Sequence, residues 1–167
     1  MSRDECWVPV WLGLGSNQDS PRDQLERAFR KLNDLPRTQL LRRSALYRNP
    51  PMGSVPQADF LNAVAGLLTQ LEPDVLLEHL QALEEQAGRQ RESELHWGPR
   101  PLDLDLLIYG QAILSLPGLT VPHPGIAERN FVLFPLLATA PELHIPGLGS
   151  VRRLAEQADA TGLEKVD

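Results

Sequence analysis

The sequence contains a single cysteine, Cys6, so no disulfide can form within the chain. Residues 1–5 lack the basic stretch that opens a secretory signal. The apolar run at residues 7–14 is broken by Pro9 and is much shorter than the ~20 residues that cross a bilayer. We therefore expect a protein of the reducing cytoplasm without a membrane-spanning segment.

Excess positive charge is also missing. The formal net charge is −6, and aromatic residues make up only 5% of the chain. Proteins that bind nucleic acid or an anionic membrane usually carry a broad basic surface. We expect no nucleic-acid or membrane partner, so any phosphate group must meet a local cluster of basic side chains.

Length and composition describe an ordinary globular chain. Its 167 residues are close to the size of one domain with a sizeable core. Apolar residues make up 42% and charged residues 23%, and no internal repeat, low-complexity run or interdomain linker is visible. We expect one domain over residues 1–167.

Hydrophobic patterning predicts four strands and two helices before Gly110. The strands are expected at residues 8–14, 38–48, 60–70 and 102–109. One helix should run from Pro21 to residue 35, with Ser20 as its N-cap. The other should begin at Pro73 and end before Gly88, which stands at the C′ position.

The order β-α-β-β-α-β is that of a ferredoxin-like α/β (α+β) fold. Its two helices pack on one face of a mostly antiparallel sheet, and we expect the other face to be available for a ligand. Short apolar runs beyond Gly110, and a helix at residues 151–158, predict C-terminal additions to this core.

The strongest chemical signal is Leu102-Asp103-Leu104-Asp105-Leu106. A strand has a side-chain period of two, so both carboxylates should lie on one face and the leucines on the other. Neighbouring carboxylates repel unless cations lie between them, and hard oxygen ligands suit Mg²⁺ bound together with phosphate oxygens. An Asp-x-Asp pair alone is more typical of an edge strand with a solvated polar face, so the surrounding residues must support a metal site.

Basic residues surround that strand in the sequence. Arg89, Arg91 and Arg100 bracket the polar loop before it, and His123 and Arg129 follow it. The planar fork of arginine suits phosphate oxygens because it donates two hydrogen bonds at once. Scattered surface arginines and a structural histidine are the alternative interpretation.

Other patterns are less informative. Gly13-x-Gly15 is like part of a dinucleotide-binding motif, but Gln18 occupies the third glycine position, and a tight turn explains these glycines. Phe60 and Phe131 are core candidates that also suit a planar ligand. No triad-like or zinc-type pattern of catalytic residues is present, so the sequence indicates no covalent nucleophile.

One longer stretch, Trp97-Gly98-Pro99-Arg100-Pro101-Leu102-Asp103-Leu104-Asp105, closely resembles the signature of the 6-hydroxymethyl-7,8-dihydropterin pyrophosphokinase family. Further motifs of that family follow in order, and the resemblance runs from about residue 8 to about residue 143. They are Gly13-Leu14-Gly15-Ser16-Asn17, Asn49-Pro50-Pro51-Met52-Gly53, Asp59-Phe60-Leu61-Asn62, Gly88-Arg89-Gln90-Arg91 and Leu119-Thr120-Val121-Pro122-His123.

The resemblance implies a monomeric enzyme of folate biosynthesis that transfers the β,γ-pyrophosphoryl unit of ATP to the pterin hydroxymethyl group. Asp103 and Asp105 would hold two Mg²⁺ ions, and the catalytic set would add Arg89, Arg91 and Arg100. The pterin would contact Asn49, Pro51, Met52, Phe60, Asn62 and Phe131. The cosubstrate ATP would lie among Gln81, Glu84, Arg91, Trp97, Arg100, Leu106, Thr120, His123 and Arg129. The loops at residues 50–59 and 89–101 would flank the site.

Four positions depart from the pattern that is common in the family. Asn49 stands where threonine is common and Phe60 where tyrosine is common. Gly118 stands where an arginine can occur, and Pro124 where histidine or tyrosine is usual. These departures leave the metal pair intact, and we expect their effect on nucleotide affinity and on some polar contacts.

Two alternative functions stay open from the residues alone. A Mg²⁺-dependent nucleotidyltransferase or nucleotide hydrolase would use the same aspartates and is distinguished by its products. An RNA-binding module can share the ferredoxin-like plan, but the low aromatic content and the negative charge argue against it.

Overall fold

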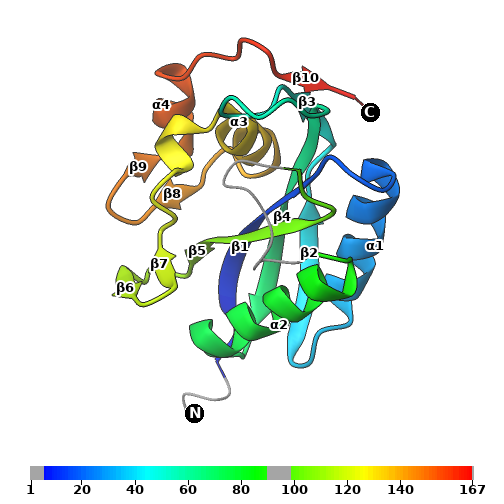
Figure 1. The fold of residues 1–167 in the computed structure, drawn as a ribbon. Coiled ribbons are helices and arrows are strands. Elements are labelled where there is room, and N and C mark those ends of the chain that lie inside the picture. The colour runs from blue at the N-terminus through cyan, green and yellow to red at the C-terminus, as the bar shows by residue number, and fades with distance from the viewer. Residues whose placement is uncertain (1–5, 90–98, 167) are drawn as a thin grey trace.

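The computed structural model describes residues 6–89 and 99–166. Figure 1 shows a central sheet with helices on both sides. The elements follow one another as β1 (Val8–Ser16), α1 (Pro21–Asn33), β2 (Thr38–Arg43), β3 (Tyr47–Asn49), β4 (Phe60–Thr69), α2 (Pro73–Gln86), β5 (Asp103–Tyr109), β6 (Leu114–Leu116), β7 (Leu119–Val121), the 3-10 helix η2 (Ile126–Glu128), α3 (Asn130–Thr139), β8 (His144–Ile145), β9 (Gly149–Ser150), α4 (Val151–Glu156) and β10 (Glu164–Lys165).

The main sheet has the strand order β10-β3-β4-β1-β5, and β2 also pairs with β4. Neighbouring strands run antiparallel. Helices α1 and α2 contact one face of this sheet, where Leu25, Phe29 and Leu32 of α1 join Leu76 and Leu80 of α2 in the main core. The predicted ferredoxin-like fold with C-terminal additions is confirmed.

The opposite face is only partly open, which corrects the expectation of a free face. Helices α3 and α4 cover one half of it in a second core cluster, in which Trp11, Val64 and Leu107 of the sheet meet Leu133 and Leu136 of α3. The part of the sheet with Gly13 and Gly15 of β1 and Asp103 and Asp105 of β5 lies outside this cluster. The additions therefore leave one half of the face for a pocket.

The predicted strand at residues 38–48 is two strands. β2 and β3 both pair with β4, and they are separated at residues 44–46. Ser44 lies at the break, where its hydroxyl accepts a hydrogen bond from the Val64 N–H at 2.8 Å. The Ser44 hydroxyl replaces the backbone carbonyl that would accept this hydrogen bond in a continuous strand. The chain therefore leaves the sheet after β2 and pairs with β4 again from Tyr47.

Helix α3 was not predicted, because residues 130–139 are apolar on all sides and contain Pro135. The helix predicted at residues 151–158 is α4, and its N-cap Ser150 accepts a hydrogen bond from the Arg153 N–H. Helix α1 begins at Pro21 as predicted, but Ser20 has φ of 61° and its side chain makes no capping hydrogen bond. No helix of the described residues is long and apolar enough to span a membrane.

Candidate active site

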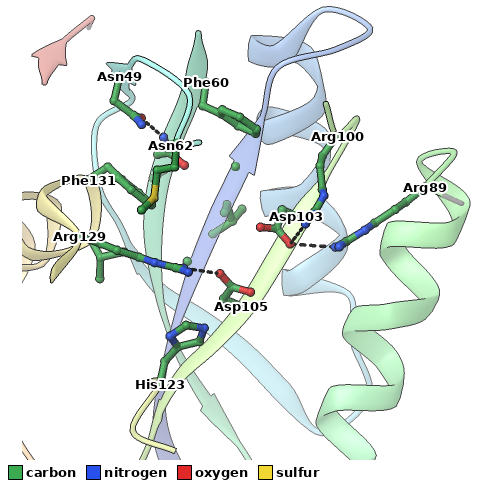
Figure 2. A pocket seen from close by; sticks show the side chains of 16 residues that line it. Asn49, Phe60, Asn62, Arg89, Arg100, Asp103, Asp105, His123, Arg129 and Phe131 are labelled. Atoms are coloured by element: carbon green, nitrogen blue, oxygen red, sulfur yellow. Dashed lines mark hydrogen bonds and ion pairs between the residues drawn. The ribbon is translucent and has the colours of Figure 1, made fainter. Parts of the chain in front are cut away.

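A pocket of about 290 Å³ lies on the half of the sheet that α3 leaves uncovered. Figure 2 shows its walls, with the two aspartates near its centre and basic side chains on both sides of them. The lining residues are Gly13, Leu14, Gly15, Asn49, Met52, Phe60, Asn62, Ala63, Arg89, Arg100, Asp103, Asp105, His123, Arg129, Phe131 and Val132. Residues from distant parts of the sequence therefore meet in one cavity.

Asp103 and Asp105 lie on the pocket face of β5, as the period of two predicted. Leu104 and Leu106 between and after them point into the main core, where each is 4% exposed. The leucines anchor the strand by burial, and this fixes the two carboxylates side by side at the pocket floor.

Two glycines of β1 make room beside the aspartates. Gly13 pairs with Asp105, and Gly15 pairs with Asp103 on one side and with Asn62 on the other. A Cβ atom added to Gly15 would lie 2.8 Å from the Asn62 Oδ1 atom. These glycines belong to the strand and not to a turn, and the interpretation of a tight turn is wrong for them.

Arg89 reaches the site through the end of helix α2. Gly88 has φ of 100°, which a residue with a side chain rarely adopts. The Gly88 N–H donates to the Glu85 carbonyl at 3.0 Å and the Arg89 N–H donates to the Glu84 carbonyl at 3.1 Å. This is the Schellman end predicted for Gly88, and it turns the chain so that Arg89 lies back over its own helix.

The buried Arg89 guanidinium joins two carboxylates. Its Nη1 atom lies 2.8 Å from Asp103 Oδ1 and also donates to Glu84 Oε2. Glu84 is 1% exposed and accepts a further hydrogen bond from the Leu104 N–H at 2.9 Å. Since a buried charge is stable only when it is paired and hydrogen-bonded, this cluster locks α2 to β5 beside the first aspartate.

Arg100 approaches the same aspartate from another segment. Its Nη1 atom lies 4.0 Å from Asp103 Oδ1. Its backbone is held by Asn17, whose Oδ1 atom accepts the Arg100 N–H at 2.8 Å and whose own N–H donates to the Arg100 carbonyl at 3.1 Å. The Asn17 Nδ2 atom donates to Gln57 Oε1 at 2.8 Å and to the Ala58 carbonyl at 3.0 Å.

Asn17 therefore joins the segment of Arg100 to the segment that precedes β4. No role was predicted for Asn17, although it ends the family motif Gly13-Leu14-Gly15-Ser16-Asn17. Because Asn17 is 6% exposed and uses both ends of its amide, we expect it to set the distance between the two flanking segments.

Arg129 and His123 lie on the other side, next to Asp105 (Figure 2). Arg129 Nη1 is 3.4 Å from Asp105 Oδ2. His123 Nδ1 accepts the Gly125 N–H at 3.0 Å, so the neutral ring carries its proton on Nε2. Burial and the charge of Arg129 lower the pKa of His123, which favours this neutral form.

Aromatic and amide side chains form the remaining wall. Phe60 and Asn62 come from β4, and Phe131 comes from the first turn of α3. Asn62 Nδ2 donates to Asn49 Oδ1 across the β3–β4 pair. Flat rings beside an amide are suited to a planar heterocycle with polar edges.

Some predicted residues lie elsewhere. Pro51 lines a neighbouring groove of about 460 Å³ that shares Asn49, Met52 and Phe131 with the pocket. Glu84 and Leu106 are buried beneath the pocket floor, Gln81 lies on α2, and the exposed Thr120 lies on β7. Arg91 and Trp97 fall outside the described residues. Their roles toward a ligand stay predictions.

The carboxylate pair is electrostatically unfavourable as it stands. Burial raises the pKa of Asp105 to about 7, and repulsion from Asp103 adds to the increase, while the charge of Arg129 opposes it. Within the described residues no group of three or more His, Cys, Asp or Glu side chains is arranged to hold a metal ion. A cation at the pair would therefore need further oxygen ligands from a substrate.

The fold and the site together define an α+β protein in which one pocket combines paired carboxylates, arginines and an aromatic wall, as phosphoryl-transfer chemistry on a planar substrate requires. The sequence model of the 7,8-dihydro-6-hydroxymethylpterin-pyrophosphokinase (HPPK) family matches residues 11–141. The chain belongs to this family, and the resemblance found in the sequence is confirmed.

Individual relatives extend this match over nearly the whole chain. A 2-amino-4-hydroxy-6-hydroxymethyldihydropteridine pyrophosphokinase of Pseudomonas aeruginosa is 43% identical over 157 residues, which cover 94% of this chain and 96% of that protein. The protein of the same name from Haemophilus influenzae is 38% identical over 150 residues, covering 90% of this chain and 92% of its own.

Solved structures agree on the fold. A Plasmodium falciparum HPPK-DHPS triple mutant with SDX-DHP superposes with a TM-score of 0.73 at 14% identity over 93% of this chain. The wild-type Plasmodium falciparum HPPK-DHPS with pteroate superposes with a TM-score of 0.71 at 14% identity over 91% of this chain. This chain spans only 42% and 44% of those two chains.

The raised pKa of Asp105 predicts a pH-dependent stability. The Asp105 carboxyl group of the folded protein stays protonated up to about pH 7, whereas in the unfolded chain it loses its proton near its ordinary pKa of 3.8. The folded state thus binds more protons between these values, and the free energy of unfolding should fall as the pH rises from about 4 to about 7.

We expect Asp105→Asn to abolish this decrease in the free energy of unfolding. In thermal unfolding with a chelator, the variant should gain about 2–4 °C over the wild type at pH 8 for each ~1 kcal/mol of relieved repulsion, and nothing at pH 4. The exposed Asp34, changed to Asn, is the matched control. If the difference in unfolding temperature between variant and wild type were the same at pH 4 and pH 8, the expectation would be contradicted.

Proposed function

We propose that this protein transfers pyrophosphate from ATP to 6-hydroxymethyl-7,8-dihydropterin, giving AMP and the pterin diphosphate in folate biosynthesis. The observation that carries the proposal is the joint pocket: Asp103 and Asp105 share it with Arg89 and Arg100 on one side and Arg129 on the other. Asn62 and the two phenylalanines lie in the same pocket. Names of relatives at up to 44% identity support the same activity.

Phosphoryl transfer depends on positioning and on stabilising negative charge. Arg89 and Arg129 now pair with the aspartates at 2.8 Å and 3.4 Å, so both guanidinium groups already lie at the pocket floor. We propose that they and Arg100 direct guanidinium N–H groups toward the phosphate oxygens of ATP, and that Arg91 and Trp97 complete the site.

The aspartate pair fits Mg²⁺. Two adjacent carboxylates supply hard oxygen ligands, and burial together with repulsion from Asp103 raises the pKa of Asp105, so a bound cation would stabilise the charged pair. Mg²⁺ is usually held by one or two carboxylates together with substrate phosphates. We propose two ions at Asp103 and Asp105, and their chemistry would be to neutralise the phosphates and to lower the pKa of the substrate hydroxyl.

The pterin is assigned to the aromatic wall. Phe60 and Phe131 would stack on the ring, while the Asn62 amide and the backbone near Met52 would hydrogen-bond its polar edge. Asn49 orients the Asn62 amide by accepting from Nδ2, which leaves Oδ1 for a ligand N–H. Gln81, Glu84, Leu106, Thr120 and His123 are assigned to the ATP side together with Arg129.

Other properties also remain our proposals. A single domain, a monomeric state and a cytoplasmic location accord with the length, the composition and the lone Cys6. The alternative activity is that of a Mg²⁺-dependent nucleotidyltransferase or nucleotide hydrolase. The aromatic wall favours the pterin enzyme, because a hydrolase has no need of a second planar subsite.

The product pattern tests the activity directly. With Mg²⁺, ATP and 6-hydroxymethyl-7,8-dihydropterin, AMP and the pterin diphosphate should form in equal amounts by chromatography, and omission of Mg²⁺ should abolish both. ADP as the main product would indicate attack on the γ-phosphorus. AMP formed equally well without pterin would indicate a hydrolase, and either result would defeat the proposal.

The carboxylate pair is tested by Asp103→Asn and Asp105→Asn. Each change removes a charge with nearly unchanged shape, so turnover at saturating Mg²⁺ should fall by about 10²–10³-fold, as after loss of other charge-stabilising groups. Asp34→Asn should leave turnover unchanged. Wild-type turnover in either pocket variant would rule out the metal assignment.

The aromatic wall is tested by Phe60→Ala and Phe131→Ala. Stacking contributes about 0.5–1.5 kcal/mol beyond burial, so pterin affinity should fall by about 2- to 12-fold and ATP affinity less. The control is Phe134→Ala, because Phe134 is a partly buried residue of α3 outside the pocket lining. Equal losses for both ligands by calorimetry would return the two phenylalanines to a purely structural role.

A further inference from the structure

The C-terminal segment at residues 157–166, here called the C-terminal strap, returns from α4 to the edge of the main sheet (Figure 1). Its strand β10 pairs with β3, with Glu164 opposite Arg48 and Lys165 opposite Tyr47. The Val166 N–H donates to the Leu46 carbonyl at 2.9 Å. The strap thus provides the outer neighbour of the short strand that ends in Asn49.

The strap also holds the start of α3. Asn130 Nδ2 donates to the Asp159 carbonyl at 2.8 Å and to the Thr161 carbonyl at 3.2 Å. The Asp159 carboxylate in turn accepts the Thr161 N–H at 2.8 Å, which keeps this turn in one shape. Asn130 directly precedes Phe131 of the pocket, so the strap is tied to both flanks of the aromatic wall.

A third contact is made by Gly162. Its φ is 83°, and a Cβ atom placed there would lie 3.2 Å from Pro50 Cδ and 3.3 Å from Pro50 Cγ. Pro50 and Pro51 connect Asn49 to Met52, and both Asn49 and Met52 line the pocket. The strap therefore lies against the backbone that carries the polar part of the wall.

The contacts are confined to one end of the site. In the order β10-β3-β4-β1-β5, the strap pairs at one edge of the sheet, and the aspartates lie on β5 at the other edge. Arg89 is joined to the β5 edge through Asp103 and Glu84. A disturbance of the strap should therefore move Asn49, Met52 and Phe131 without moving the acidic pair.

We propose that the C-terminal strap is a positioning element of the pterin subsite, which sets the place of Asn49 and Phe131 and thereby the affinity for the pterin ring but not for the nucleotide. The proposal rests on the function proposed above, which assigns the pterin to this wall. It adds residues 157–166, with Gly162 and Asn130 as the positions through which the strap acts.

The test is Gly162→Ala, which combines a strained backbone with a close approach to Pro50. Calorimetry with 6-hydroxymethyl-7,8-dihydropterin would use full-length protein saturated with Mg²⁺ and a non-hydrolysable ATP analogue. We expect the pterin Kd to rise by about 3- to 10-fold and the analogue Kd to stay within about twofold, because only one wall is displaced. The turnover number at saturating pterin should be unchanged.

The matched control is Gly149→Ala. Gly149 has φ of 103°, and nothing lies within 4 Å of an added Cβ atom, so the change brings similar backbone strain without a contact to the strap. It should leave both dissociation constants at their wild-type values. Asn130→Ala removes both hydrogen bonds to the strap and serves as the second variant if Gly162→Ala does not fold. It should raise the pterin Kd more than the analogue Kd, because Asn130 adjoins both Phe131 and Arg129.

The outcomes separate this proposal from the one on which it rests. If the wild type does not bind the pterin at all, the proposed function falls and the strap proposal falls with it. If the wild type binds the pterin but the variants bind it equally well, or if they lose pterin and nucleotide affinity to the same extent, the strap has only a structural role.

Discussion

The repulsion between Asp103 and Asp105 is the constraint around which the site is organised. Their places on one face of β5 follow from the burial of Leu104 and Leu106, so the strand cannot separate them without exposing its core side. Arg129 and Arg89 offset part of the repulsion. Burial raises the pKa of Asp105, and the repulsion that remains adds to the increase, so a cation with its phosphate ligands would favour the charged pair.

Glu84 makes this arrangement rigid. A third carboxylate so near the pair adds to the repulsion, yet Glu84 is almost fully buried because it accepts from the Arg89 side chain and from the Leu104 backbone. Removing one member of such a cluster would leave a buried charge without compensation. The end of α2, set by Gly88, is thus part of the site although it lies on the far side of the sheet from the pocket.

The sequence predicts those parts of the fold and the site that depend on neighbouring residues in the chain. The alternation in β5, the proline starts of α1 and α2, and the glycine end of α2 follow from short-range rules. The break at Ser44 and the role of Asn17 do not, because they depend on partners distant in sequence, 83 residues away for the Asn17 bond to Arg100. Helix α3 gave no periodic signal because its apolar residues are spread around the whole helix.

The sheet register brings the proposed pterin and metal positions into one row. Gly15 of β1 pairs with Asn62 of β4 and with Asp103 of β5, so three pocket residues form one row across the sheet. Strands lie about 4.8 Å apart, which places the outer two strands about 10 Å from each other. Since Gly15 has no side chain, the Asn62 amide can lie over β1, where its Oδ1 atom would be only 2.8 Å from an added Cβ atom. The absent side chain at the centre of the row is therefore as much a part of the site as the two polar groups at its ends.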